Sequence, residues 1–451
     1  MGIPDHMLDD TGVALALDAA AGLGAADAEV VLSRSVGLDV GVANGEVETF
    51  GVAESVGAGV RVFTSDRRMG FAYTSEVTDG LEALIRSAWE NAQPGHPDEH
   101  NVLPDECAVS DEDWREQGFE DVRTEDKVGF ARRLEERTLA ADARMTRVRA
   151  AEYGEVSFES MIANSRGMKR RFRSAYCSCS VMAAAGGPGL DEESGWEFDL
   201  GRRLDELDLE SVATQCADKA VRLLGARPCE TRAMPVLLDN RIASAFLSVL
   251  CPAMLASSVL KGKSFLKGRV GEAVAGARVT VVDRNDDALG LNPRPFDGEG
   301  VSAQTTTLID SGTLRGYLHN AYTAAKMGTA TTANAVRAGH RSTPEVGASN
   351  CRLEPGGYTQ EQLAGMMDAG LFVTAAMGVH TADPISGEFS FGAAGLTVEK
   401  GRFGRPVRGV TISGNLRDLF QKIQAVGNDL RFFSSCGAPS VLVGEMMVSG
   451  T

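Results

Sequence analysis

The stretch T-T-T-L-I-D-S-G-T-L-R-G-Y-L, residues Thr305–Leu318, reads as two short strands joined over the turn Asp310-Ser311-Gly312. Asp, Ser and Gly are typical turn residues, and the runs on either side of them have the character of strands. We therefore expect a β-hairpin here. Similar runs lie before and after it in the last part of the chain, at Met234–Leu238, Leu371–Ala376, Gly395–Val398 and Val407–Ile412.

Helices interrupt these strands at only a few points. Asp239 is placed to cap a helix after the first of the strands, because its side chain can accept hydrogen bonds from free backbone amides. Two further helices are predicted over Ala321–Met327 and Asn415–Val426, each followed by a glycine that favours a helix end. The 51 glycines of the chain suit a domain with many turns. We predict that residues 232–451 form a β-rich C-terminal domain with a few helices.

The first 227 residues alternate between helical and strand-like patterns. Before the Pro-rich linker Gln93–Asp111 we expect three elements. They are a helix near Asp9–Leu23, a hairpin around Asn44-Gly45 and an amphipathic helix from about Thr78 to Ala92. After the linker we expect helices at Thr124–Ala141 and Leu209–Leu224, strands at Val148–Phe158, Arg170–Ala184 and Gly195–Leu200, and a loop at Ala183–Glu193. The predicted fold class is α+β: an N-terminal α/β region of two subdomains with mixed sheets, 1–100 and 112–227, precedes the C-terminal domain.

Composition excludes several classes of protein. Hydrophobic residues make up 43% and charged residues 24% of the 451, which is typical of a globular chain. A formal net charge of −17 disfavours nucleic-acid binding, and we interpret the run Met168–Arg173 as a solvated strand face. The longest apolar stretches are too short for a membrane span, and the N-terminus lacks the pattern of a signal peptide. We expect a cytoplasmic protein whose eight cysteines are mostly buried, reduced thiols.

Several strings resemble the TldD/PmbA family, known as modulators of DNA gyrase. Arg294-Pro295-Phe296-Asp297-Gly298-Glu299-Gly300-Val301 resembles the family's PFDxEG stretch, and Tyr322–Gly328 resembles its Y-x-A-x-K-x-G string. The block Asp383–Gly395 and the strings Ile412–Leu416 and Val426–Asp429 are similar to its C-terminal motifs. The N-terminal region resembles the family at Ala25–Val30, Gly45–Glu48 and Gly59–Tyr73, so the resemblance covers nearly the whole chain. The resemblance implies a heterodimeric zinc peptidase that degrades unfolded peptides or processes peptide precursors in a central chamber.

Within this family the chain resembles the PmbA (TldE) branch. In the TldD branch, zinc is held by the two histidines of an H-E-x-x-x-H helix and a later cysteine, with the Glu as general base. Alignment places Leu247, Ser248 and Pro252 at the His, Glu and His positions, and no His, Asp or Glu occurs between Arg241 and Lys267. A shift of one residue in the alignment does not restore the motif. The resemblance implies a subunit with degenerate catalytic positions, with zinc expected in its TldD-like partner.

The histidines and Cys436 offer no further convincing zinc motif in the sequence. Cys436 matches the position of the third zinc ligand, but as a single cysteine it reads as a small packed residue rather than a ligand. Among the six histidines only His96 and His100 are close in sequence, and Pro97 between them disfavours a helical metal pair. His319 reads as a structural residue of a hairpin strand. We therefore expect no stoichiometric zinc in the isolated chain.

Substrate contacts are expected near the block Asp383–Gly395, because extended peptides bind by adding a strand to a sheet edge. The candidates are His380, Asp383, Ser386, Gly387, Phe389 and Ser390. A second interpretation is that Gly387, Gly392 and Gly395 only serve turns. The leading hypothesis is a non-catalytic subunit that pairs with a TldD-like protease, with a homodimer possible in isolation. Two alternatives stay open: a peptidase that uses Cys436 with a histidine from elsewhere, and a regulatory binding protein of a toxin–antitoxin or DNA gyrase system without peptidase activity.

Overall fold

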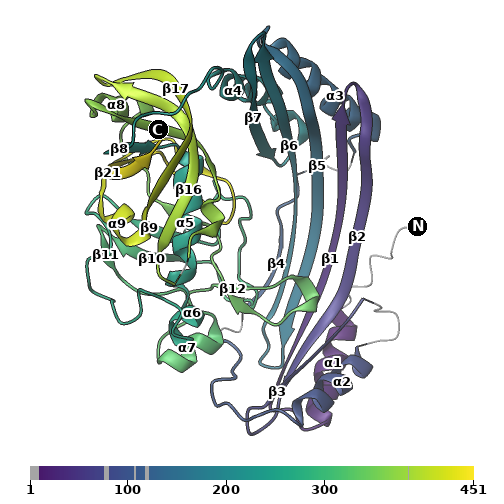
Figure 1. Cartoon of the computed structure of the whole chain (residues 1–451). Helices are drawn as coiled ribbons and strands as arrows, with labels where there is room; N and C mark the ends of the chain where they lie inside the picture. Colours follow the sequence, from purple (N-terminus) through teal and green to yellow (C-terminus); the bar gives the residue numbers. More distant parts are fainter. Residues whose placement is uncertain (1–9, 76–80, 106–107, 117–120, 384, 451) are drawn as a thin grey trace. The chain divides into compact units, whose positions relative to one another are not determined.

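The computed structural model describes residues 10–75, 81–105, 108–116, 121–383 and 385–450. The chain has an α+β fold in which helices and several sheets are mixed (Figure 1). It divides into two compact units. The N-terminal unit comprises residues 1–224 together with Arg337–Pro344, and the C-terminal unit comprises Gly225–Val336 and Glu345–Thr451.

The N-terminal unit is built around one mixed sheet. Its strands run in the order β3-β2-β1-β5-β6-β4, and β7 also pairs with β6. All pairs are antiparallel except β4 with β6. Both predicted N-terminal subdomains therefore contribute strands to the same sheet. The strand bounds are β1 Asp27–Ala43, β2 Glu46–Phe63, β3 Met69–Thr74, β4 Val109–Asp113, β5 Met145–Asn164, β6 Lys169–Gly187 and β7 Leu190–Gly201.

Helices cover this sheet at its two ends (Figure 1). At one end α1 (Asp10–Gly22) and α2 (Glu82–Ala92) build an apolar core with the start of β1 and the end of β2. At the other end α3 (Thr124–Ala140) and α4 (Leu209–Val221) build a second core with the end of β1, β5 and β6. The long strands thus connect two separate cores.

The expected turn at Asn44-Gly45 is confirmed, because both residues adopt positive φ angles of 54° and 77° between β1 and β2. The expected loop Ala183–Glu193 is wrong. β6 and β7 continue through it and are joined by a short turn at Pro188-Gly189, where Gly189 has a φ of 73°. The strands persist because Ala183, Ala184 and Ala185 are buried and keep their ladder partners. Thr78–Gly80 of the expected second helix lies outside the described residues.

The segment 337–344 belongs to the N-terminal unit although it is far along the chain. Arg337 forms an ion pair with Glu29 of β1, and Glu29 also binds Arg61 of β2 through two hydrogen bonds of 3.0 and 2.7 Å. His340 Nδ1 lies 2.9 Å from Ser33 Oγ. A Cβ on Gly59 would lie 2.2 Å from the His340 carbonyl oxygen, so glycine is required for this close approach.

Two larger sheets form the C-terminal unit. The first has the order β17-β16-β15-β8-β21-β18, with an additional pairing of β17 with β21, and the second has the order β11-β10-β9-β14-β20-β19. A two-stranded pair, β12–β13, lies apart from them. The bounds are β8 Arg232–Leu238, β9 Val281–Arg284, β10 Thr305–Asp310, β11 Thr313–Leu314, β12 Ala335–Val336, β13 Glu345–Val346, β14 Cys351–Leu353, β15 Ala369–Met377, β16 Glu388–Glu399, β17 Arg402–Asn415, β18 Ile423–Val426, β19 Arg431–Phe432, β20 Cys436–Ala438 and β21 Val441–Ser449.

The helix α5 (Asn240–Leu250) contacts strands of both sheets, β15 and β8 in the first and β20, β19 and β14 in the second. Its apolar side chains join the largest core of the molecule. The other helices are α6 Ala256–Leu260, α7 Ala321–Met327, α8 Gln360–Gly365 and α9 Leu416–Gln421. The expected helix Asn415–Val426 is therefore too long: residues 423–426 form β18, because Ile423 pairs with Val443 of β21. The hairpin predicted at Thr305–Leu318 is confirmed as β10 and β11, although β11 is short.

Among the described residues, every helix is too short or too polar to cross a lipid bilayer.

Candidate functional site

The positions aligned with the zinc helix lie on α5 and just after it. Asp239 caps this helix by accepting a hydrogen bond of 2.9 Å from the Arg241 amide, as expected from the sequence. The helix ends at Leu250, and a 3-10 turn, Cys251–Met254, follows it. Proline lacks an amide hydrogen and cannot continue the regular helix, so Pro252 accounts for the change.

The side chains at these positions do not suit a catalytic zinc ion. Leu247 is 1% exposed and belongs to the apolar core. Ser248 Oγ donates a 3.0 Å hydrogen bond to the Ser244 carbonyl oxygen and lies 3.3 Å from Ser434 Oγ. Leu247 and Pro252 have no donor atoms, and a serine hydroxyl is a poor proton acceptor near neutral pH. A peptidase site of two histidines, a cysteine and a glutamate base does not fit these residues.

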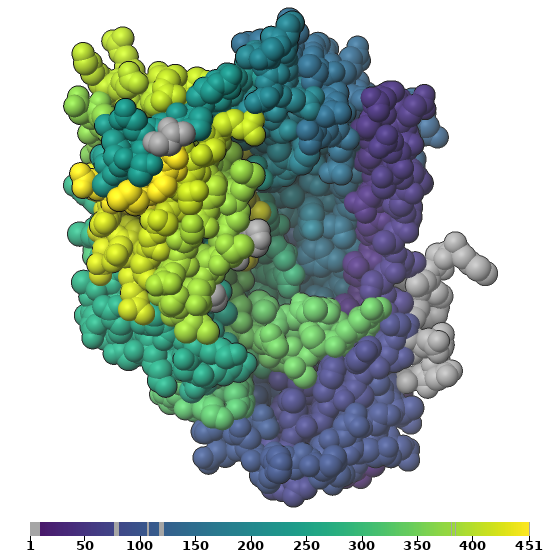
Figure 2. All heavy atoms as spheres, viewed as in Figure 1, coloured from purple at the N-terminus to yellow at the C-terminus, as the bar shows by residue number. Residues whose placement is uncertain are grey.

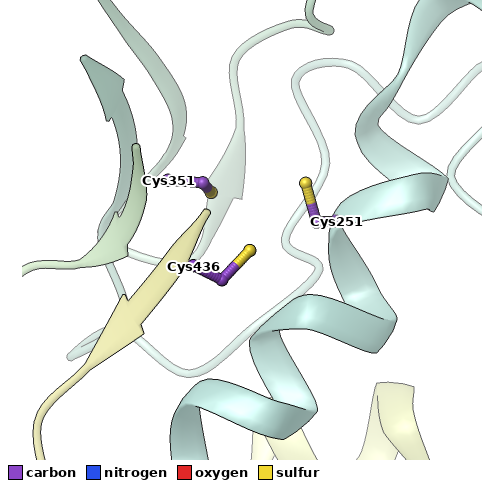
Figure 3. Close-up of side chains that lie close together, drawn as sticks. All are labelled: Cys251, Cys351 and Cys436. Atoms are coloured by element: carbon purple, nitrogen blue, oxygen red, sulfur yellow. The ribbon is translucent and has the colours of Figure 1, made fainter. Parts of the chain in front are cut away.

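Cys436 is not the single cysteine that the sequence analysis took it to be. Its Sγ atom and those of Cys251 and Cys351 all lie within 4.8 Å of one another, and all three residues are buried. Figure 3 shows the three side chains close together, with Cys251 at the end of a helix and Cys436 on a strand facing it. This cluster, which we call the three-cysteine cluster, lies entirely within the C-terminal unit.

Strand pairing explains how the cluster forms. Cys351 opens β14 and is the direct partner of Cys436 on the parallel strand β20. On its other side Cys351 faces Asp283 of the antiparallel strand β9. Cys251 approaches from the turn after α5, whose helix packs on β20. The three residues are about a hundred positions apart in the chain, so their spacing carries no motif that sequence reasoning could have used.

The three thiols of the cluster differ in the direction of their pKa shifts. Hydrogen bonds from Cys251 and from Cys351 hold the pKa of Cys436 well below its usual value, despite burial. Hydrogen bonds with Cys251 and Cys436, together with burial, raise the pKa of Cys351 well above its usual value. Cys436 is therefore the thiol that ionises first.

Asp283 is the nearby buried acid. Burial raises its pKa to about 6, although hydrogen bonds from Ser349 and Asn334 oppose this change. Its Oδ1 atom accepts from Asn334 Nδ2 at 2.7 Å and from Ser349 Oγ at 2.5 Å, and its Oδ2 atom accepts from the Ser349 amide at 2.9 Å. Both carboxylate oxygens thus have protein partners.

The predicted substrate block forms the turn before β16 and the first half of that strand. Asp383 Oδ1 accepts from the Ile385 amide at 2.7 Å, Asp383 Oδ2 accepts from Ser386 Oγ at 3.0 Å, and Gly387 completes the turn with a φ of 81°. Phe389 is buried against Phe246 of α5, with ring centroids 5.0 Å apart, whereas Ser386 and Ser390 are exposed. Yellow-green atoms of the region around β16 and β17 lie at the surface of the C-terminal unit (Figure 2).

The hypothesis of a free sheet edge is wrong for the second half of the block. From Gly392 onward β16 pairs with β15 on one side and with β17 on the other. Gly395 has no turn role either, since a Cβ there would lie 1.8 Å from the Phe372 carbonyl oxygen and the strands approach too closely for a side chain. Gly387 does serve a turn. A role of the exposed residues in substrate binding stays a prediction.

The histidines do not gather into a metal site within the described residues. His96 and His100 lie outside helices and strands, as expected, and His6 lies outside the described residues. His319 is buried, its amide donates to Thr332 Oγ1 at 2.7 Å, and burial lowers the pKa of its imidazole. His340 belongs to the N-terminal unit. The side chain of His380 is outside the described part of the chain.

A hollow of about 710 Å³ in the N-terminal unit is lined by several basic side chains. These cations have acidic partners: Arg34 binds Glu54, Lys127 binds Glu155 and Arg173 binds Asp111 and Glu159. Arg115 and Arg171 are paired with Asp113 and Asp10 in the same way. Lys169, Arg171 and Arg173 on one face of β6 are therefore paired with acids and only partly exposed, whereas the sequence analysis interpreted this run as a solvated strand face.

Models of one protein family match most of the chain. They are the PmbA/TldA metallopeptidase domain 1 at residues 28–92, the central domain at 118–224 and the C-terminal domain at 231–450. With this fold and these matches, the chain belongs to the PmbA/TldD metallopeptidase family.

Individual relatives agree along nearly the full length. The metalloprotease PmbA of Escherichia coli O157:H7 is 29% identical, and the match covers 98% of this chain and 96% of that protein. A structure from Thermotoga maritima, named for a modulator of a DNA gyrase, superposes with a TM-score of 0.87 at 27% identity over 98% of this chain and 100% of the other. TldE of Thermococcus kodakarensis shares the fold, with a TM-score of 0.87 at 20% identity over 97% and 100% of the two chains.

Proposed function

We propose that this chain is the non-catalytic subunit of a heterodimeric zinc peptidase that degrades unfolded peptides or processes peptide precursors. One observation carries the proposal: where a family peptidase needs two zinc ligands and a base, the chain has a core leucine, a serine that is already hydrogen-bonded, and a proline. A chain without a base near a water-binding metal lacks the means to generate the attacking hydroxide.

The similarity to PmbA along nearly the full chain and the fold shared with TldE support the peptidase family in this proposal. The partner in this proposal is a family member that retains the H-E-x-x-x-H helix and holds the zinc ion. This chain would complete the chamber, exclude water from it and help to hold an extended substrate. Misplacement of a bound substrate by about 1 Å can lower a rate roughly a hundredfold, so a subunit that only positions substrate has a large effect.

The test mixes purified full-length chain with its cognate H-E-x-x-x-H family member and follows cleavage of unfolded casein. We expect a stable complex in gel filtration and a rate well above that of either protein alone. Replacing the partner's motif glutamate with glutamine should abolish cleavage. Ser248→Ala in this chain should leave the rate unchanged, since the proposal gives Ser248 no chemical role.

Two results would reject the proposal. A partner that is equally active alone, and that neither co-elutes with this chain nor changes its products, would favour the regulatory binding protein. Cleavage of casein by this chain without any partner would favour an independent peptidase.

A further inference from the structure

Three thiols that converge from separate segments form an unusual group in the core of the C-terminal unit. Cys251, Cys351 and Cys436 come from the turn after α5, from β14 and from β20, and they are 5%, 0% and 2% exposed. Cys229, another buried cysteine of the same unit, is not part of this cluster. A buried free cysteine can pack as a small apolar residue, but three Sγ atoms within 4.8 Å of one another also form a set of possible metal ligands.

The sulfur positions match what a thiophilic cation requires. Tetrahedral Zn–S bonds of about 2.3 Å place the sulfur atoms of a zinc site about 3.8 Å apart. In this structure the three Sγ atoms lie within 4.8 Å of one another. Bringing them to zinc distances needs movements of about 1 Å or less, which side-chain rotations can supply.

Charge decides which cation fits. Binding to a metal removes the protons of the thiols, so three ligands bring up to three negative charges into a buried site. The neighbouring ionisable group, Asp283, is an acid and adds no positive charge. A monovalent ion would leave a large excess of negative charge, whereas a divalent ion neutralises most of it. Sulfur ligands select zinc among the common divalent ions, while oxygen ligands select magnesium and calcium.

We propose that Cys251, Cys351 and Cys436 bind one Zn²⁺ ion through three thiolates, with a water molecule in the fourth position of the tetrahedral ion. This donor set shares Cys436 with the positions on which the expectation of a metal-free chain rested, but Cys251 and Cys351 take the place of the two histidines. The ion would tie together the end of α5 and two strands that are distant in sequence. It would not supply peptidase chemistry, because Asp283 is held by Asn334 and Ser349 and Ser248 is no base.

The first experiment titrates reduced, metal-free, full-length protein with Cd²⁺, whose thiolate complexes absorb in the ultraviolet. We expect one Cd²⁺ per chain with thiolate-to-metal charge-transfer absorption, displacement by Zn²⁺, and a higher melting temperature with metal bound. Cys351→Ser should weaken binding about a hundredfold or more. Cys229→Ser is the matched control and should bind like the wild type.

A second measurement uses only the wild-type chain, so it can test the zinc site even if Cys351→Ser fails to fold. X-ray absorption of the zinc-loaded wild-type chain should show three sulfur neighbours at about 2.3 Å. The assignment would be overturned if the zinc ion had only nitrogen and oxygen neighbours, or if the reduced protein took up no Cd²⁺. It would also be overturned if the two serine variants bound Cd²⁺ equally well, or if the protein took up Cu(I) but no divalent ion. A disulfide within the cluster in protein purified under reducing conditions would also overturn it. None of these outcomes depends on a partner subunit, so they are separable from the proposed function.

Discussion

Glu29 and Arg337 are 308 residues apart in the sequence and form an ion pair inside the N-terminal unit. The side chain of Glu29 is fully buried and that of Arg337 is 6% exposed. Arg61 occupies the other side of the same carboxylate, so two guanidinium groups offset the cost of burying one acid. Their charges hold the pKa of Glu29 below its ordinary value, even though burial acts to raise it.

Arg337→Ala should destabilise the N-terminal unit. Removal of one partner from a buried ion pair typically costs about 3–5 kcal/mol, and the remaining bond from Arg61 should keep the loss near about 3 kcal/mol. All three tryptophans of the chain, Trp89, Trp114 and Trp196, lie in this unit, so their fluorescence during urea unfolding reports on it directly. Arg341→Ala, at an exposed residue of the same segment, should change the unfolding free energy by less than about 0.5 kcal/mol. Equal losses for the two variants would contradict a special role of the buried pair.

Gly59→Ala should disturb the packing of residues 337–344 against β2. Its new methyl group would lie 2.2 Å from the His340 carbonyl oxygen, closer than real contacts allow. We expect a loss of about 1–3 kcal/mol and faster proteolysis within 337–344, read by mass spectrometry of the fragments. Gly51→Ala on the same strand is the control, because nothing lies within 4 Å of its added Cβ. A Gly59→Ala protein as stable and protease-resistant as the control would show that the segment shifts without cost.

The stability of the C-terminal unit should fall as the pH rises from about 4 to 7. Burial, followed by the neighbouring Glu299, raises the pKa of Asp297 to about 7. The ordinary pKa of an aspartate side chain is 3.8. Between these values the folded state binds a proton that the unfolded state has lost, so the free energy of unfolding decreases with increasing pH.

Glu299→Gln should reduce this dependence, because it removes the charge that helps to raise the pKa of Asp297 while an amide oxygen still accepts from the Ala321 amide. Chemical denaturation followed by circular dichroism at pH 5 and pH 8 measures the difference, and we expect it to shrink by about 1 kcal/mol or more. Glu361→Gln, at an exposed site, should leave the difference unchanged. A larger difference in Glu299→Gln than in the wild type would show that the sign is wrong.

Substitutions of Ser390 and Phe389 should distinguish an effect on substrate binding from an effect on core packing. Ser390 is exposed, and Ser390→Trp should raise the KM for peptide of the mixed peptidase several-fold without changing its melting temperature. Phe389 packs against Phe246 and Phe391, so Phe389→Ala should lower the unfolding free energy by about 3–5 kcal/mol. An unchanged KM in Ser390→Trp would remove Ser390 from the substrate candidates.

Local signals in the sequence predicted most of the elements, and long-range pairing accounts for those that it missed. The turn at Asn44-Gly45, the cap at Asp239 and the hairpin at Asp310–Gly312 depend on the residues at the turn or cap itself, and all three are confirmed. Residues 423–426 look helical next to α9, but pairing with β21 converts them to a strand. Local propensity is weak compared with such tertiary pairing.

In the candidate site, too, the sequence revealed what local motifs encode and missed what long-range pairing brings together. The vacant zinc positions were visible because the family motif is local, whereas Cys251 and Cys351 gave no signal. They meet Cys436 only through the parallel pairing of β14 with β20 and the packing of α5 on β20. No single window of sequence contains that information.

The membership of residues 337–344 in the N-terminal unit affects how the protein emerges from the ribosome. About 120 residues separate the end of the first 224 from the end of this segment. At a synthesis rate of roughly 5–20 residues per second, about 6–24 s pass between the synthesis of the first 224 residues and that of the whole segment 337–344. During that interval Glu29 has only Arg61 as a partner, and the surface over Gly57 and Gly59 lacks its cover. A gene split after codon 224 would therefore encode an N-terminal half without residues 337–344, which the other half would have to supply by association.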